Sequence, residues 1–159
     1  MLKRLPTRPR ISSQGIMRLA IVASRYNWEF VEPMVAKARE EIELIEPTAK
    51  IEIVHAPGAF EIPFLARQVI ERRKPDAVIC LGVILRGETG HADIIAFAVS
   101  DILCRLSVET LIPVTNGVLL LNNEEQAIER CLGVEFNRGS EGARTAIETL
   151  RASRSLTKR

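Results

Sequence analysis

The sequence predicts an α/β protein built as a three-layer sandwich, in which a central four-stranded parallel sheet lies between two layers of helices. Short apolar runs typical of buried strands alternate with segments whose apolar residues recur every three or four positions, as on one face of a helix. Strands that alternate with helices form parallel sheets with right-handed crossovers. The longest apolar run, residues 77–85, suits a central strand that is covered on both faces.

The first half of the chain supplies two strands and two helices. Residues 19–23 form the first predicted strand, and helical spacing of apolar residues follows over residues 31–45. Pro33 fits the first turn of that helix, where its missing N–H has no cost. Residues 51–54 form the second strand, and the second helix follows Pro63.

The second half repeats this alternation. Residues 77–85 form the third strand, and the helix after it has apolar residues at helical spacing from 95 to 106. The fourth strand covers residues 113–121. Two shorter helices around residues 124–131 and 141–151 complete the prediction.

We expect one domain, residues 17–152, with short extensions at both ends. The length of 159 residues suits a single hydrophobic core. Residues 1–16 are basic, contain Pro6 and Pro9 and have no apolar period, which indicates an arm that is flexible or held by a partner. Residues 153–159 form a predicted C-terminal tail.

Composition excludes several classes of protein. Lys and Arg are spread among Asp and Glu, with a net charge of +2, so no basic face for nucleic acid is predicted. No apolar stretch reaches the roughly 18 residues of a membrane span, and the N-terminus has no signal-like apolar region. Cys80, Cys104 and Cys131 lack metal-ligand spacing and are interpreted as small buried hydrophobes in a reducing cytosol. We therefore expect a cytoplasmic protein without a metal.

The loops after the predicted strands carry the candidate site, because ligands of open α/β sheets bind at the carboxyl ends of the strands. Residues 86–93 combine two glycines, the hydroxyl of Thr89 and the start of a helix, which suits a phosphate. His91 lies beside them and can transfer protons near neutral pH. The alternative is a glycine turn with a helix-capping Thr89 and a surface histidine.

Two other loops and two late arginines have similar alternatives. In residues 57–63, glycine permits close approach of a ligand and Glu61 can accept hydrogen bonds from hydroxyl groups, or Glu61 only stabilises a helix N-terminus. In residues 24–28, the aromatic rings can stack on a planar heterocycle or anchor the loop. Arg130 and Arg138 can bind phosphate or lie solvated at the surface.

Taken together, five segments resemble the 6,7-dimethyl-8-ribityllumazine synthase family, in family order and with family spacing over residues 19–150. They are Ser-Arg-Tyr-Asn at 24–27, Pro-Gly-Ala-Phe-Glu-Ile-Pro at 57–63, Arg-Gly-Glu-Thr-Gly-His-Ala-Asp at 86–93, Glu-Gln-Ala-Ile-Glu-Arg at 125–130 and Asn-Arg-Gly-Ser-Glu at 137–141. The resemblance implies a flavodoxin-like fold. It also implies a transferase of riboflavin biosynthesis that condenses 5-amino-6-(D-ribitylamino)uracil with 3,4-dihydroxy-2-butanone 4-phosphate and uses no cofactor.

The resemblance also assigns roles to residues. His91 is the implied proton-transfer residue, and Glu88 and Thr89 contact the phosphate. Arg130, Arg138 and Asn116 belong to the neighbouring subunit's side of the site, with Arg130 on the phosphate. The remaining implied contacts are to the pyrimidine and its ribityl chain, and they come from Tyr26, Asn27, Ala59, Phe60, Glu61, Val83, Ile84 and Leu85.

Four positions depart from the family pattern, and they bear on affinity. Tyr26 replaces Phe, Asn116 stands where many members have Phe, Ala92 replaces an aromatic residue, and Arg138 replaces Lys. His91, Glu61 and Arg130 are retained.

The resemblance implies a homo-oligomer with the pentamer as its minimum and leaves a decamer or an icosahedral shell of sixty subunits open. The alternatives to an enzyme are a catalytically idle shell-forming relative and a flavin-binding relative.

Overall fold

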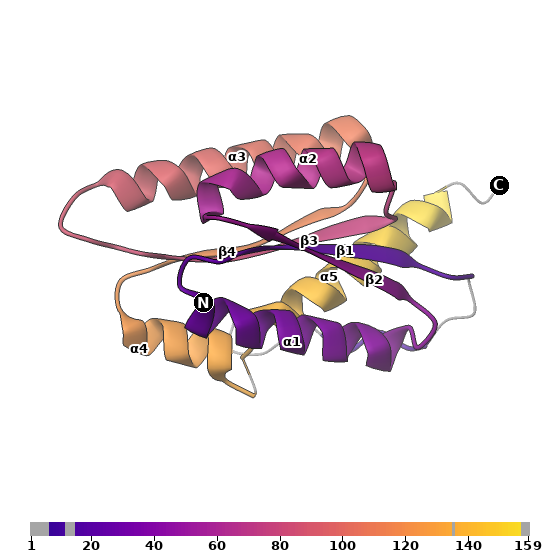
Figure 1. Ribbon diagram of the computed structural model, residues 1–159. Coiled ribbons are helices and arrows are strands. Elements are labelled where there is room, and N and C mark those ends of the chain that lie inside the picture. The colour runs from indigo at the N-terminus through magenta and orange to yellow at the C-terminus, as the bar shows by residue number, and fades with distance from the viewer. Residues whose placement is uncertain (1–6, 12–14, 135, 157–159) are drawn as a thin grey trace.

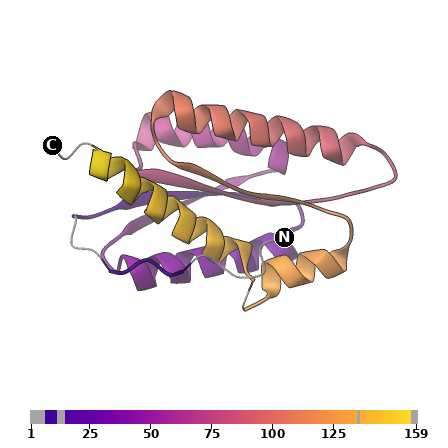
Figure 2. The same ribbon diagram turned by 180° about the vertical axis from the view of Figure 1, so that it is seen from behind.

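The computed structural model describes residues 7–11, 15–134 and 136–156, and these have the predicted three-layer architecture (Figures 1 and 2). Helices α2 and α3 cover one face of the sheet, and α1, α4 and α5 cover the other. The elements in chain order are β1 (Arg18–Ser24), α1 (Trp28–Ile45), β2 (Lys50–Ala56), the 3₁₀ turn η1 (Ala59–Glu61), α2 (Ile62–Arg73), β3 (Ala77–Leu85), α3 (His91–Thr110), β4 (Val114–Leu121), α4 (Glu124–Ala127), the π-helical turn η2 (Ile128–Leu132) and α5 (Arg138–Leu156).

All four predicted strands are present and pair in parallel, in the order β2-β1-β3-β4. The flavodoxin-like α/β sandwich is therefore confirmed. Because every strand runs the same way, the carboxyl ends of β1, β2 and β3 meet at one edge of the sheet. This is the edge at which the sequence predicts a ligand site.

Several helix boundaries differ from the prediction, among them the start of α2 at Ile62, before Pro63, and that of α5 at Arg138. The carbonyl of Asn27 accepts hydrogen bonds from the amides of Phe30 and Val31, so α1 begins at Trp28, and Pro33 lies inside the helix rather than in its first turn. Helix α3 begins at His91 rather than after the 86–93 loop. Helix α5 continues to residue 156, into the segment predicted as a tail.

The core has two parts, one on each face of the sheet, because alternate residues of each strand point to opposite faces. Ile79 and Leu81 of β3 pack toward α1 and α5, whereas Val78 and Cys80 pack toward α2 and α3. Burial raises the pKa of the Cys80 thiol, which stays protonated as a small apolar side chain.

The interpretation of the cysteines as buried hydrophobes holds for two of the three. Cys80 and Cys131 are buried, but Cys104 is exposed. Leu103 and Leu106 of α3 face the core, and Cys104 lies one position beyond Leu103. One residue turns a helix by about 100°, which carries Cys104 out of the buried face.

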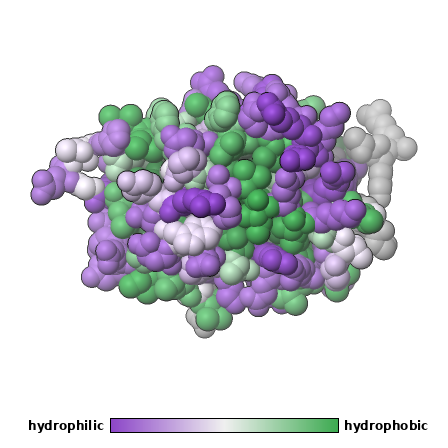
Figure 3. All heavy atoms as spheres, viewed as in Figure 1, coloured by the Kyte–Doolittle hydropathy of each residue, from purple (hydrophilic) through white to green (hydrophobic). Residues whose placement is uncertain are grey.

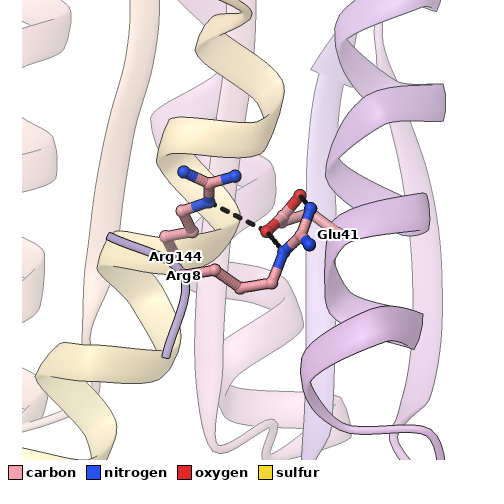
Figure 4. Close-up of polar contacts among 3 residues, drawn as sticks. All are labelled: Arg8, Glu41 and Arg144. Carbon is pink, nitrogen blue, oxygen red and sulfur yellow. Dashed lines mark hydrogen bonds and ion pairs between the residues drawn. The ribbon is translucent and has the colours of Figure 1, made fainter. Parts of the chain in front are cut away.

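The described part of the N-terminal segment is held by its own chain. Pro9 is buried, and Arg8 donates from Nε and Nη2 to the two carboxylate oxygens of Glu41 on α1, at 2.6 and 3.1 Å. Arg144 on α5 donates to the same carboxylate at 2.8 Å (Figure 4). Arg8 and Pro9 of the predicted arm therefore contact the folded domain, and residues 1–6 and 12–14 of that arm lie outside the described residues.

Glu41 is a buried carboxylate that joins three segments of the chain, with only 4% of its surface exposed. Burial by itself raises the pKa of Glu41, but the hydrogen bonds from Arg8 and Arg144 outweigh this effect and lower the pKa below its ordinary value of 4.5. The carboxylate therefore remains charged in the folded protein at neutral pH.

Replacing Glu41 with Gln is expected to lower the free energy of unfolding at pH 7 by about 3 kcal/mol, because it removes the charge that faces two guanidinium groups. A lowered pKa in the folded state means that this contribution is present above pH 4.5 and is lost as the pH falls through the folded pKa. Denaturant unfolding at several pH values measures the difference, which should shrink in acid.

Glu40→Gln is the matched control. Glu40 is the preceding residue and forms an exposed ion pair with Lys37, so its replacement should change the free energy of unfolding by about 0.5 kcal/mol or less. Equal losses for the two variants would contradict a special role of Glu41.

Parts of the surface are apolar, and two strands of the described structure each have an edge without a hydrogen-bonded neighbouring strand. β2 and β4 stand at the two ends of the strand order, so each has one edge unpaired within the described residues. Hydrophobic surface gathers in the middle of the face shown in Figure 3, over the β2 edge between α1 and α2. Large apolar side chains of α2 and α3 are also exposed, namely Phe64, Ile94, Phe97 and Val108. Among the described residues, no helix combines the length and apolar character that crossing a bilayer requires.

Candidate active site

A cleft of about 480 Å³ opens at the carboxyl ends of β1, β2 and β3. Its volume lies in the ordinary range of small-molecule sites. It brings together nine of the residues predicted for the site, which reach it from three different strand ends. They are Tyr26, Asn27, Ala59, Phe60, Glu61, Val83, Ile84, Leu85 and His91.

Tyr26 and Asn27 form the turn between β1 and α1. Tyr26 is 75% exposed and lines the cleft, so its ring is free to stack on a planar ligand. The side-chain amide of Asn27 donates to the carbonyl of Val83 at 2.8 Å and so ties this turn to the end of β3. The loop-anchor alternative applies instead to Trp28, which lies outside this cleft and packs edge-on against His55 with ring centroids 5.2 Å apart.

Gly58 and Glu61 shape the part of the cleft that follows β2. The Gly58 amide donates to Oε2 of Glu61 at 3.1 Å, which fixes the carboxylate at the entrance to η1. A Cβ added at Gly58 would lie 2.9 Å from that same oxygen. The glycine therefore leaves room for the carboxylate, whose second oxygen can accept a hydrogen bond from a ligand.

His91 is the first residue of α3 and faces the cleft from the end of the β3–α3 loop. Glu88 and Thr89 lie in this loop, are exposed, and are not among the residues that line the cleft. Gly90 occupies the N-cap position of α3 without a side-chain hydrogen bond, so the alternative that Thr89 caps this helix is wrong.

The other three predicted residues lie elsewhere. Asn116 and Arg138 line a second cleft of about 320 Å³, between the β4 edge, α3 and α5. Arg138 forms an ion pair with Glu141, and its Nε is buried without a hydrogen-bond partner in the described structure. Arg130 is 92% buried in η2 and has no ion pair with any described residue. A single chain thus holds the predicted residues in separate places.

One residue of the first cleft was not predicted, namely Ile95, whereas Gly58 is the glycine expected to allow close approach of a ligand. The helical spacing assigned Ile95 to the core, but it is only half-buried and lies one turn after His91. Its place on the same helix face as His91, four residues apart, is the signal that could have identified it. Among the described residues, no group of three or more His, Cys, Asp or Glu side chains could hold a metal ion.

The chain is similar to one known protein family over most of its length. The sequence model of a family described as 6,7-dimethyl-8-ribityllumazine synthase matches residues 16–154. The match spans both clefts and Arg130, and it covers nearly all of the described structure.

Proposed function

Because the chain belongs to the 6,7-dimethyl-8-ribityllumazine synthase family, we propose that the cleft at the ends of β1, β2 and β3 is one half of its active site. The enzyme is a transferase of riboflavin biosynthesis that acts on two small molecules, the ribitylaminouracil and the four-carbon ketone phosphate. The observation that carries the proposal is the convergence of Tyr26, Glu61 and His91 on one cleft from three strand ends.

The cleft supplies contacts of the kinds that the pyrimidine substrate needs. The exposed ring of Tyr26 stacks on the flat heterocycle, and the backbone of residues 83–85 pairs with its polar edge. The carboxylate of Glu61 accepts from the ribityl hydroxyl groups, beside the close backbone approach that Gly58 allows. These contacts orient one reactant and leave His91 beside the other.

The reaction forms an imine, eliminates phosphate and closes a ring, and each step moves a proton. Holding two reactants in a productive geometry lowers the barrier by on the order of 7–11 kcal/mol in favourable cases. A positioned histidine contributes roughly 10²–10⁴-fold more by accepting and donating these protons. The loop at Glu88 and Thr89, which leads into His91, receives the phosphate of the ketone substrate.

We propose that a second copy of the chain supplies the other half of the site. Arg130, Arg138 and Asn116 do not line the His91 cleft of their own chain. A head-to-tail arrangement, in which the surface around β4 and η2 of one copy meets the His91 cleft of the next, closes into a ring. Arg130 then reaches the substrate phosphate of the neighbouring copy, and a charge-assisted contact stabilises it there.

The exposed apolar surfaces support such an assembly. Phe64, Ile94 and Phe97 are exposed on α2 and α3, and apolar surface lies over the unpaired edge of β2 (Figure 3). Apolar patches of this kind mark surfaces that another protein covers. With the family resemblance, they favour a pentamer of the 17.7 kDa chain as the smallest competent unit. A cytoplasmic location stays a prediction from the sequence.

Replacing His91 with Ala tests the catalytic assignment. We expect the rate of lumazine formation from the two substrates, followed by absorbance, to fall roughly 10²–10⁴-fold while the native mass stays unchanged. His55 is the second of the two histidines and lies outside the cleft, so His55→Ala should retain the wild-type rate. A wild-type rate in His91→Ala would remove this role, and no turnover in the wild-type protein would favour the idle shell or flavin-binding alternatives.

A further inference from the structure

The loop that carries Glu88 and Thr89 and leads into His91 has almost no packing of its own. Residues 86–91 are all exposed. A Cβ added at Gly87 or Gly90 would meet no atom within 4 Å, and neither glycine has a positive φ. Neither side-chain packing nor a special backbone turn therefore fixes this loop, although the chemistry proposed for it needs a defined geometry.

One side chain ties the base of this loop together. Arg86 donates from Nε to Oδ2 of Asp93 at 3.2 Å and from Nη2 to Oδ1 at 2.5 Å, a bidentate pair between the start of the loop and the first turn of α3. Its remaining Nη1 donates to Oδ1 of Asn122 at 2.5 Å, just beyond β4. The Arg86 amide also donates to the carbonyl of Leu121 at 2.9 Å. Only a guanidinium has enough donors in one plane for these contacts.

The charges of the pair agree with this geometry. The hydrogen bond to Asp93 raises the pKa of Arg86, and the same bond from Arg86 lowers the pKa of Asp93. Both groups are therefore charged at neutral pH. Both are also about half exposed, at 42% and 51% of their side chains. Most exposed ion pairs contribute little to the free energy of unfolding, and the exceptions are bidentate pairs such as this one. The bidentate geometry of Arg86 and Asp93 joins the two ends of the loop that leads to His91.

We propose that Arg86, Asp93 and Asn122 are positioning residues that hold residues 87–90 and the start of α3 in the geometry in which His91 transfers protons and the loop at Glu88 and Thr89 meets the phosphate. The inference rests on the proposed function, because it gives these residues a role only through His91 and its loop. It goes beyond that function by assigning three residues that do not line the cleft. It also links the loop to β4, the strand that borders the second cleft.

Replacing Arg86 with Gln, Asp93 with Asn or Asn122 with Ala tests the inference. Misplacing a catalytic group by about 1 Å costs on the order of 10²-fold in rate, so we expect kcat to fall about 10- to 100-fold for Arg86→Gln and Asp93→Asn, and less for Asn122→Ala. The KM for the pyrimidine substrate should stay near the wild-type value, because its proposed contacts lie on other loops. Arg86→Lys keeps the charge without the bidentate geometry and should fall between Arg86→Gln and the wild type.

Arg105→Gln is the matched control, since Arg105 forms an exposed ion pair with Asp101 on the same helix, away from the loop. It should keep the wild-type kcat. Amide hydrogen exchange read by mass spectrometry gives a measurement independent of activity. We expect the amides of residues 87–91 to exchange at least about 10-fold faster in Arg86→Gln than in Arg105→Gln, with the rest of α3 unchanged.

Added guanidinium ion supplies a further test. At millimolar concentration it should partly restore kcat to Arg86→Ala, and tetramethylammonium at equal ionic strength should not. A wild-type kcat in both Arg86→Gln and Asp93→Asn would overturn the inference, as would a lower kcat with unchanged exchange in the loop. If His91→Ala were active, the proposed function would fail instead, and the exchange data would still show whether Arg86 orders the loop.

Discussion

Refolding inactive His91→Ala chains together with inactive Arg130→Met chains is expected to restore about a quarter of the wild-type activity. In a randomly mixed ring, a working site needs an intact His91 from one chain and an intact Arg130 from its neighbour. Each condition is met in about half of the cases. Alone, His91→Ala lacks the proposed proton-transfer group and Arg130→Met lacks the proposed phosphate-binding cation, and we expect a loss on the order of 10²-fold or more for each. Methionine is chosen at position 130 because it keeps most of the volume of the buried arginine side chain.

A mixture of two variants that both alter the same half of the site provides the control. His91→Ala and Glu61→Gln both damage the cleft that a single chain forms, so no arrangement of mixed chains gives a site with both groups intact. This mixture should stay as inactive as its components. Recovery in the control, or none in the His91→Ala and Arg130→Met mixture, would contradict a site divided between copies. Initial rates after refolding, at fixed total chain concentration, provide the measurement.

Replacing Gly139 with Ala is expected to destabilise the fold by about 3 kcal/mol or more. A Cβ at this position would lie 1.9 Å from the carbonyl oxygen of Met34 and 2.6 Å from its carbonyl carbon. Backbone atoms in the middle of α1 have no rotamer through which to move away, so the two helices must separate. A loss of this size lowers the melting temperature by roughly 10 °C in a domain of this length. Thermal unfolding followed by circular dichroism gives the value.

Gly142→Ala is the matched control, one turn further along α5. A Cβ there would lie 3.3 Å from Cγ2 of Ile79, a side-chain atom that can shift slightly. Alanine is the better helix former by about 1 kcal/mol, which offsets this tight contact. We expect a free energy of unfolding within about 1 kcal/mol of the wild type. Equal losses at both positions would show that the contact with Met34 is not the cause.

The sequence predicted the sheet well because buried parallel strands leave a simple signal. Residues 77–85 are apolar throughout, and the strand found there has the same bounds. Helix starts were predicted less well, since they depend on single backbone contacts. The carbonyl of Asn27, with Asn27 itself at a positive φ of 54°, starts α1 three residues before the apolar period does. The spacing of apolar residues contains no information about where such a backbone contact starts a helix.

The candidate site was predictable to the extent that it follows the strand ends. Tyr26, Glu61 and His91 come after three different strands, and the rule that parallel strands end together was enough to expect them near one another. Contacts between loops were not predictable. Arg86 and Asn122 are 36 positions apart, and nothing in their local sequence distinguishes them from solvated polar residues. The placement of Arg130 and Asn116 in a neighbour's half of the site came only from the family resemblance, because their proposed partner is another copy of the chain.

The proposed division of the site between two copies affects how the rate of the enzyme depends on its amount. With the site divided as proposed, a free chain has two half-sites and no complete one. A closed ring then has as many complete sites as chains, whereas an open row of copies leaves one unused half at each end. Below the concentration at which rings form, the rate should therefore rise more steeply than in proportion to the protein present. A cell that makes this chain would obtain very little lumazine from the first few copies, and full output per copy only after assembly.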